Sequence, residues 1–153
     1  MTPLSYSAAA EPCFDLRDPD ARIAACTQGI NSGKLTDAQQ AIGYSNRGAA
    51  GHQNGDNDRA IADFNEAIRL GLKDSAIFNS RGIAWFDESD IDRAIGDFSE
   101  AVRLDPKNIT ALSNRRATYH EKCDNDHAIA DFSAAIRLDP KGRQGFQQPM
   151  YRL

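Results

Sequence analysis

The chain has 153 residues, a formal net charge of −4 and a charged fraction of 26%, which predicts a single soluble, mildly acidic domain. This balance argues against nucleic-acid binding without sequence preference, because such binding needs concentrated Lys and Arg. No apolar run approaches the roughly 18 residues that a membrane-spanning helix requires.

Residues 1–12 are predicted to form a flexible N-terminus, since they show no helical period. The segment lacks the basic start and the long apolar stretch of a complete signal peptide. Its three alanines before Glu11 are nevertheless typical of the small-residue end of such a peptide. Two interpretations remain open: the remnant of a trimmed export signal, or a plain flexible end.

Residues 13–40 are predicted to hold a degenerate half repeat and a connector. Arg22–Ile30 has the apolar spacing that Ala60–Ile68 shows further along, which predicts one helix capped by Asp18 or Asp20. We expect this helix to cover the exposed face of the next helix pair, as the ends of stacked arrays require.

The rest of the chain is dominated by an internal repeat with a step of 34 residues. The segment AIADFNEAIRL at Ala60–Leu70 returns as AIGDFSEAVRL from Ala94 and as AIADFSAAIRL from Ala128. Apolar spacing in each half of a unit predicts two helices, joined at a turn whose Asp caps the second helix. A fixed period of this size predicts a stack of helix pairs. The three full repeats span 41–74, 75–108 and 109–142.

Four positions carry the same kind of residue in every repeat. Position 4 is large, positions 20 and 27 are Ala, and position 24 is Phe: Tyr44, Phe78 and Leu112; Ala60, Ala94 and Ala128; Ala67, Ala101 and Ala135; Phe64, Phe98 and Phe132. This pattern resembles the tetratricopeptide repeat (TPR). The resemblance implies an all-α fold, an α-solenoid wound as a right-handed superhelix, with three TPR helix pairs and an N-terminal half-repeat helix.

Two departures from the family pattern bear on packing. Position 11 of the first repeat is Gly51, where the family has an aromatic residue, and position 8 of the third is Arg116, where it has a small one. We therefore expect the first and third helix pairs to pack less tightly than the middle pair, which has Gly82 and Trp85.

Two cysteines fall in the half repeat, 13 residues apart. Cys26 stands where the repeats have their core Phe, so its side chain is expected to point inward. It either forms a disulfide with Cys13 or the two remain small buried thiols. The pair also resembles that of short exported TPR proteins of proteobacteria. A disulfide would imply the periplasm or a secreted protein, and free thiols the cytoplasm.

In the TPR family the first helix of each repeat lines the concave side of the array. The resemblance therefore implies a groove that binds a peptide or a helix of a partner protein. Its candidate residues are Asn46, Ala49, His52, Asn79, Ile83, Phe86, Ser113, Asn114, Ala117 and His120. Asn side chains suit a peptide backbone because they both donate and accept hydrogen bonds. The alternative is a solvated inner face that binds nothing.

Chaperone-binding members of the family hold a C-terminal carboxylate with a clamp of Lys, Asn and Arg. The corresponding residues here are neutral: Ser45, Ala49, Ser80, Thr110 and Asn114. That activity is therefore not expected.

An Arg at position 7 recurs together with an Asp at position 23. These residues are Arg47, Arg81 and Arg115, and Asp63, Asp97 and Asp131. We expect Arg–Asp pairs between the two helices of a repeat or between neighbouring repeats. The alternative is an Arg whose stem packs while its head reaches water.

Catalytic and metal chemistry find little support in the sequence. His120, Cys123 and His127 could offer nitrogen and sulfur to zinc, but a turn divides them and only three ligands are present. No Gly-rich phosphate loop and no nucleophile motif occurs. We predict a non-enzymatic protein without catalytic, cofactor or metal residues.

Residues 143–153 form a C-terminal tail without the repeat pattern, and Gly145 and Pro149 oppose a covering helix. The last predicted helix still carries an apolar stripe: Ala128, Ile129, Phe132 and Ile136. Either the tail folds back over this stripe or the stripe contacts a partner or a second copy. A homodimer through the C-terminal repeat is thus the alternative to a peptide-binding adaptor.

Overall fold

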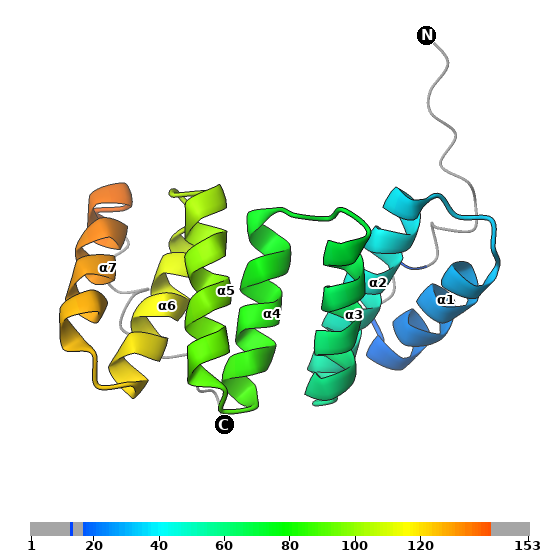
Figure 1. The fold of residues 1–153 in the computed structure, drawn as a ribbon, viewed down its shortest axis with the longest axis horizontal. Helices are drawn as coiled ribbons and strands as arrows, with labels where there is room; N and C mark the ends of the chain where they lie inside the picture. The colour runs from blue at the N-terminus through cyan, green and yellow to red at the C-terminus, as the bar shows by residue number, and fades with distance from the viewer. Residues whose placement is uncertain (1–12, 14–16, 142–153) are drawn as a thin grey trace, which may run out of the picture. The chain divides into compact units, whose positions relative to one another are not determined.

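The computed structural model describes Cys13 and residues 17–141, which hold seven α-helices and no strand (Figure 1). The helices are α1 (Pro19–Asn31), α2 (Asp37–Gln53), α3 (Asn57–Arg69), α4 (Ser75–Asp87), α5 (Ile91–Leu104), α6 (Ile109–Glu121) and α7 (Asn125–Leu138). They fall into two compact units, α1–α3 and α4–α7, divided between Lys73 and Asp74. The predicted all-α fold, with one half-repeat helix before three helix pairs, is confirmed.

Each helix begins at a side chain whose oxygen accepts a hydrogen bond from a backbone N–H in the first turn. These caps are Asp18, Thr36, Asp56, Asp74, Asp90, Asn108 and Asp124. The Asp in each turn between paired helices therefore acts as predicted, because the first N–H groups of a helix have no partner within it. Of the two candidate caps for α1, the structure uses Asp18.

The first unit packs α1 against α2 and α2 against α3. Phe64 of α3 lies against Gly48 of α2, where an added Cβ would come within 3.0 Å of the ring. A disulfide joins Cys13 to Cys26, and both cysteines are buried. The predicted disulfide therefore replaces the alternative of two buried thiols.

The second unit places α4, α5, α6 and α7 side by side in chain order. Phe98 of α5 is fully buried against Gly82 of α4. In the next pair, the Arg116 guanidinium lies 5.7 Å from the centre of the Phe132 ring, which stays partly exposed. The looser packing expected at Arg116 is found, because a long side chain takes the place that glycine holds in the other pairs.

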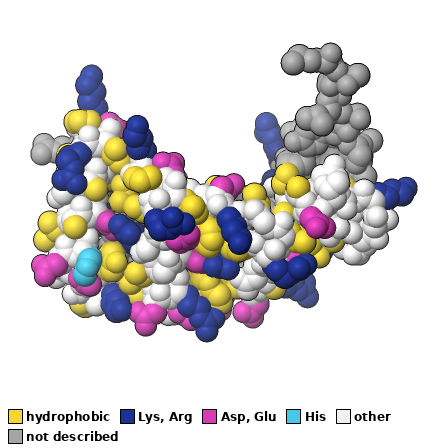
Figure 2. Space-filling view, turned by 45° about the horizontal axis from the view of Figure 1, so that its top comes forward, with side chains coloured by type: hydrophobic (Ala, Val, Ile, Leu, Met, Phe, Trp, Pro, Cys, Tyr) yellow, Lys and Arg dark blue, Asp and Glu magenta, His cyan; other side chains and the backbone are white. Residues whose placement is uncertain are grey.

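Surface charge and apolar exposure limit what the molecule can contact. On the face shown in Figure 2, basic and acidic side chains are interspersed rather than gathered by sign. None of the helices described is both long and apolar enough to cross a membrane. Of the predicted C-terminal stripe, Ala128 is buried and Ile129 is 62% exposed. The tail, one of the two covers considered for this stripe, lies outside the described residues.

Candidate functional site

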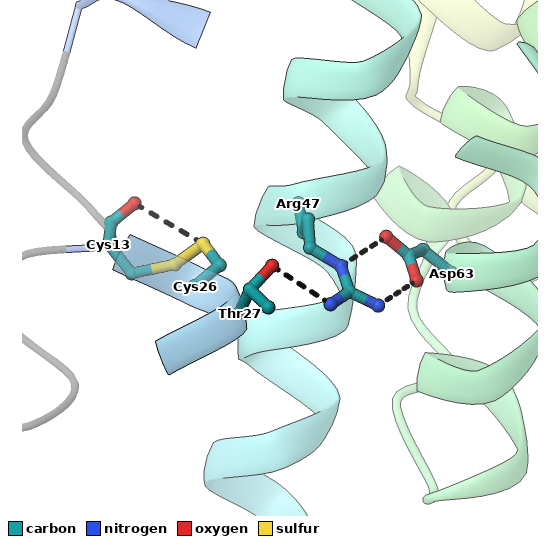
Figure 3. The surroundings of a disulfide bond; sticks show 5 residues. All are labelled: Cys13, Cys26, Thr27, Arg47 and Asp63. Carbon is teal, nitrogen blue, oxygen red and sulfur yellow. Dashed lines mark hydrogen bonds and ion pairs between the residues drawn. A yellow bond between two sulfur atoms is a disulfide. The ribbon is translucent and has the colours of Figure 1, made fainter. Parts of the chain in front are cut away.

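An Arg–Asp pair joins the two helices of each full repeat, as predicted. In the first unit, Nε and Nη2 of Arg47 donate to the two carboxylate oxygens of Asp63, at 2.8 and 2.7 Å. The third nitrogen, Nη1, donates to Thr27 of α1 at 3.1 Å (Figure 3). One guanidinium thus bonds side chains of both α1 and α3 from its place on α2.

The second unit repeats this two-pronged geometry. Arg81 donates to both oxygens of Asp97 at 2.7 Å, and Arg115 to both oxygens of Asp131 at 2.8 and 2.6 Å. Arg115 also donates through Nη1 to Ser99 of the preceding helix pair, at 3.3 Å. Every buried carboxylate of this series is therefore matched by a planar cation, which suits a structural role.

The Arg–Asp hydrogen bonds also fix the charge of the cations. The bond with Asp63 raises the pKa of Arg47, and the bond with Asp131 raises the pKa of Arg115, each against the opposing effect of burial. Both guanidinium groups therefore stay protonated across the pH range of ordinary solutions.

The predicted groove residues of the second unit lie on two neighbouring helices, α4 and α6. They are Asn79, Ile83 and Phe86 on α4, and Ser113, Asn114, Ala117 and His120 on α6, which together we name the α4–α6 face. The Nδ2 atom of Asn114 donates to the Oδ1 atom of Asn79 at 2.9 Å, so the two helices are joined within this face. Asn114 is only 5% exposed, whereas His120 is exposed and the other five are partly exposed.

The predicted groove residues of the first unit lie on α2. Asn46, Ala49 and His52 follow one another at steps of three, and each is partly exposed. The Nδ2 atom of Asn46 is buried and has no hydrogen-bond partner among the described residues. A buried donor without a partner is uncommon and costs stability.

A cavity of about 400 Å³ lies in the first unit beside Gly51, the predicted departure of the first repeat. Its walls come from all three helices and include Ile23 and Thr27 of α1, and Arg59 and Ala62 of α3. The first unit thus has open space beside Gly51. The sequence predicts that an aromatic ring is missing at Gly51. It does not predict the volume of the cavity there.

One residue of the metal hypothesis, His127, is engaged in other contacts. The ring of His127 stacks on that of Tyr119, with centroids 4.9 Å apart, and its Nδ1 atom lies 2.8 Å from the carboxylate of Asp124. His127 thus belongs to the start of α7. Within the described part of the chain, no three His, Cys, Asp or Glu side chains are arranged to hold a metal ion.

Comparison with known families decides the identity of this fold. Two models of the tetratricopeptide repeat match the sequence, at residues 33–71 and 53–109, and together they span half of the chain. The chain belongs to the TPR family. A search of curated protein sequences finds no match.

Solved TPR structures share the fold at low sequence identity. MamA aligns with a TM-score of 0.73 and 21% identity, over 82% of this chain and 71% of its own. A TPR protein from Parabacteroides merdae aligns with a TM-score of 0.78 and 16% identity, over 87% of this chain and 53% of its own. The second TPR of Spaghetti, bound to the HSP90 peptide SRMEEVD, aligns with a TM-score of 0.64 and 23% identity, over 67% and 95%.

Proposed function

We propose that this TPR protein is a non-enzymatic adaptor that binds a peptide or a helix of a partner protein along the first helices of its repeats. The observation that carries the proposal is the Asn79–Asn114 hydrogen bond, which joins α4 and α6 within one partly exposed face. TPR proteins commonly act in protein–protein interaction, and the Spaghetti domain is bound to a peptide.

The chemistry of the α4–α6 face supports a peptide ligand. The bond between the two amides uses one oxygen and one nitrogen, and leaves Nδ2 of Asn79 and Oδ1 of Asn114 without a partner among the described residues. A peptide group offers the complementary C=O and N–H. Ile83 and Phe86, one turn apart on α4, would supply apolar contact to a side chain of the ligand.

The first unit offers a matching donor. Nδ2 of Asn46 is buried without a partner, and a backbone carbonyl of the ligand would satisfy it once the side chain turns outward. We propose that Asn46, Ala49 and His52 form the peptide-contacting face of the first unit. The neutral residues at the carboxylate-clamp positions, among them Ser80 and Thr110, argue for a ligand other than an acidic C-terminus.

The adaptor proposal is tested by selecting binding peptides from a displayed random library and measuring their affinity by titration calorimetry. The double variant N79A/F86A should weaken binding about tenfold or more, because it removes a polar and an apolar anchor. The matched control N125A/I129A removes the same pair of functions from α7 and should bind as the unchanged protein does. Equal binding by both variants would refute the proposed face, and thermal melts would verify that both are folded.

Self-association through the C-terminal repeat is the second candidate function. Ile129 of α7 is 62% exposed and Leu138 of the same helix is 39% exposed, so α7 carries two of the three exposed large apolar side chains among the described residues. We propose that a second copy would cover them. Light scattering should then show the mass double with concentration, and I129D should prevent this. A monomer at all concentrations would refute self-association and leave the adaptor as the one proposed function.

We also propose that the protein works in the periplasm or outside the cell. The buried Cys13–Cys26 disulfide supports this, since such bonds persist in oxidising compartments. Mass spectrometry of the unreduced protein from its host would report the bond and the mature N-terminus together. Free thiols at both cysteines would favour the cytoplasm.

A further inference from the structure

The three repeats give three versions of one site, at the residue of position 11 and the residue eight positions later. These pairs are Gly51 and Arg59, Trp85 and Arg93, and Tyr119 and His127. In the second repeat, the Arg93 guanidinium lies 4.4 Å from the centre of the Trp85 ring. In the third, the rings of Tyr119 and His127 stack at 4.9 Å with an angle of 22° between their planes. Twice, therefore, a planar ring packs under a planar nitrogen group.

In the first repeat the ring is missing and its space is open. The cavity of about 400 Å³ has Gly51 in one wall and Arg59 in another. A Cβ atom added at Gly51 would lie 3.6 Å from the backbone oxygen of Asp56 and 3.8 Å from the backbone nitrogen of Ala60, which are ordinary contact distances. The space thus starts at the backbone of α2, where the rings of the other repeats start. Its volume lies within the range of about 300–1,000 Å³ that is typical of ligand pockets.

The lining indicates which chemistry this cavity would accept. Ile23 and Ala62 provide apolar wall. Of the charged groups, Arg47 is paired with Asp63, and Arg59 is paired with Asp56 at 3.2 Å. Because the charged residues that line the cavity are paired with one another, an ionic ligand would gain little electrostatic stabilisation from them. A neutral ring would gain apolar contact with the walls and an electrostatic contact between its face and the Arg59 guanidinium, whose side chain is 86% exposed and thus free to adjust.

We propose that the cavity beside Gly51 is a binding site for an aromatic side chain of a partner polypeptide, an indole or a phenol. The ligand ring would occupy the place that Trp85 and Tyr119 occupy in the other repeats, and Arg59 would lie over it as Arg93 lies over Trp85. This site uses other residues than the first-helix face and stands independently of the proposed adaptor function.

The test uses N-acetyl-tryptophanamide as the probe and the full, oxidised chain. Backbone amide resonances of Gly51 and Ala62 should shift saturably with the probe, while that of Gly96 stays in place. N-acetyl-leucinamide should bind at least about threefold more weakly, because it has no ring face that the Arg59 guanidinium can contact. Equal affinity for the two probes would overturn the assignment of an aromatic ligand, and the absence of a saturable shift would overturn the site.

Two substitutions and one matched control locate the site. G51W places an indole ring of the chain itself in the cavity. It should weaken the binding of the probe about tenfold or more, because the space is then filled. The control G96W adds the same side chain to α5, where an added Cβ meets nothing within 4 Å, and should bind the probe normally. R59Q, at a side chain that is 86% exposed, should weaken binding about threefold. Unchanged binding by a folded G51W or by R59Q would contradict the proposal.

Discussion

Each full repeat buries one carboxylate between its two helices and matches it with one guanidinium. The Asp131 residue is 5% exposed, and Arg115 meets both of its oxygens within 2.8 Å. Such a pair adds little net stability over an apolar one, but losing one partner leaves a buried charge without compensation. The exposed pair of Glu100 and Arg103 has similar distances and no such burial.

We expect Asp131→Asn to lower the free energy of unfolding by about 2–3 kcal/mol, because Arg115 then loses its charged partner in a half-buried site. Glu100→Gln, the matched substitution at the exposed pair, should leave the free energy of unfolding almost unchanged. Urea unfolding followed by circular dichroism measures both. Equal losses would show that burial does not set the strength of these pairs.

Acid should affect the exposed pair in a defined direction. The hydrogen bond from Arg103 lowers the pKa of Glu100. The small contribution of the Glu100–Arg103 pair to the free energy of unfolding is therefore fully present above the ordinary pKa of a glutamate. It is lost as the pH falls through the lowered pKa of Glu100. A pH series of Glu100→Gln against the unchanged chain should show the difference between them vanish in acid.

At the scale of the helix, the two middle helices approach closely because α4 has a glycine where it meets α5. A Cβ at Gly82 would lie 2.8, 2.9 and 3.2 Å from three atoms of the Phe98 ring, which is fully buried and has no room to move. Overlap of this size forces helices or rings apart. The glycine therefore sets the distance between the two helices.

Gly82→Ala should destabilise the protein by about 1–3 kcal/mol, although alanine favours a helix more than glycine does. The control is Gly96→Ala on the open side of α5, which should stabilise by up to about 1 kcal/mol. Thermal melts of the two variants should shift in opposite directions. A gain at both positions would contradict the close approach.

The helices and their pairing could be predicted because period, caps and the Phe and Ala series are local in the sequence. The Arg–Asp pairs could be predicted because both partners recur at the same step. The contact of Arg47 with Thr27 could not, since the half repeat breaks that step by a longer connector. Nor could the burial of Asn114, which depends on how closely α6 meets Asn79 of α4. The groove residues stay a prediction until a ligand is measured.

On the scale of the whole molecule, the disulfide secures the N-terminal end of the helix array. Cys26 lies on α1, which is joined to the first full repeat by the bond between Arg47 and Thr27, by the bond between Asn54 and Asp20, and by packing against α2. The bridge closes a short loop, so it restricts the unfolded chain and holds the segment at Cys13 onto α1. The covalent bond thus acts within the half repeat, whereas α1 is held against α2 by packing and hydrogen bonds.

Replacing both Cys13 and Cys26 by Ala should lower the free energy of unfolding of the first unit by about 3 kcal/mol. Amide hydrogen exchange should then quicken in α1 and α2 more than in α6 and α7, because the lost constraint is local. Cys123→Ala serves as the control, since Cys123 is a free and exposed thiol. Faster exchange spread evenly over all helices would argue against a local role of the bridge.

Trp85 is the one tryptophan of the chain, and it lies against Arg93 in the second unit. Its fluorescence therefore reports on α4 and α5 alone, whereas far-ultraviolet ellipticity averages over every helix. The protein thus carries an optical probe of one unit while the covalent bridge lies in the other. Recording both signals during denaturation, with and without reductant, measures how strongly unfolding spreads along the array.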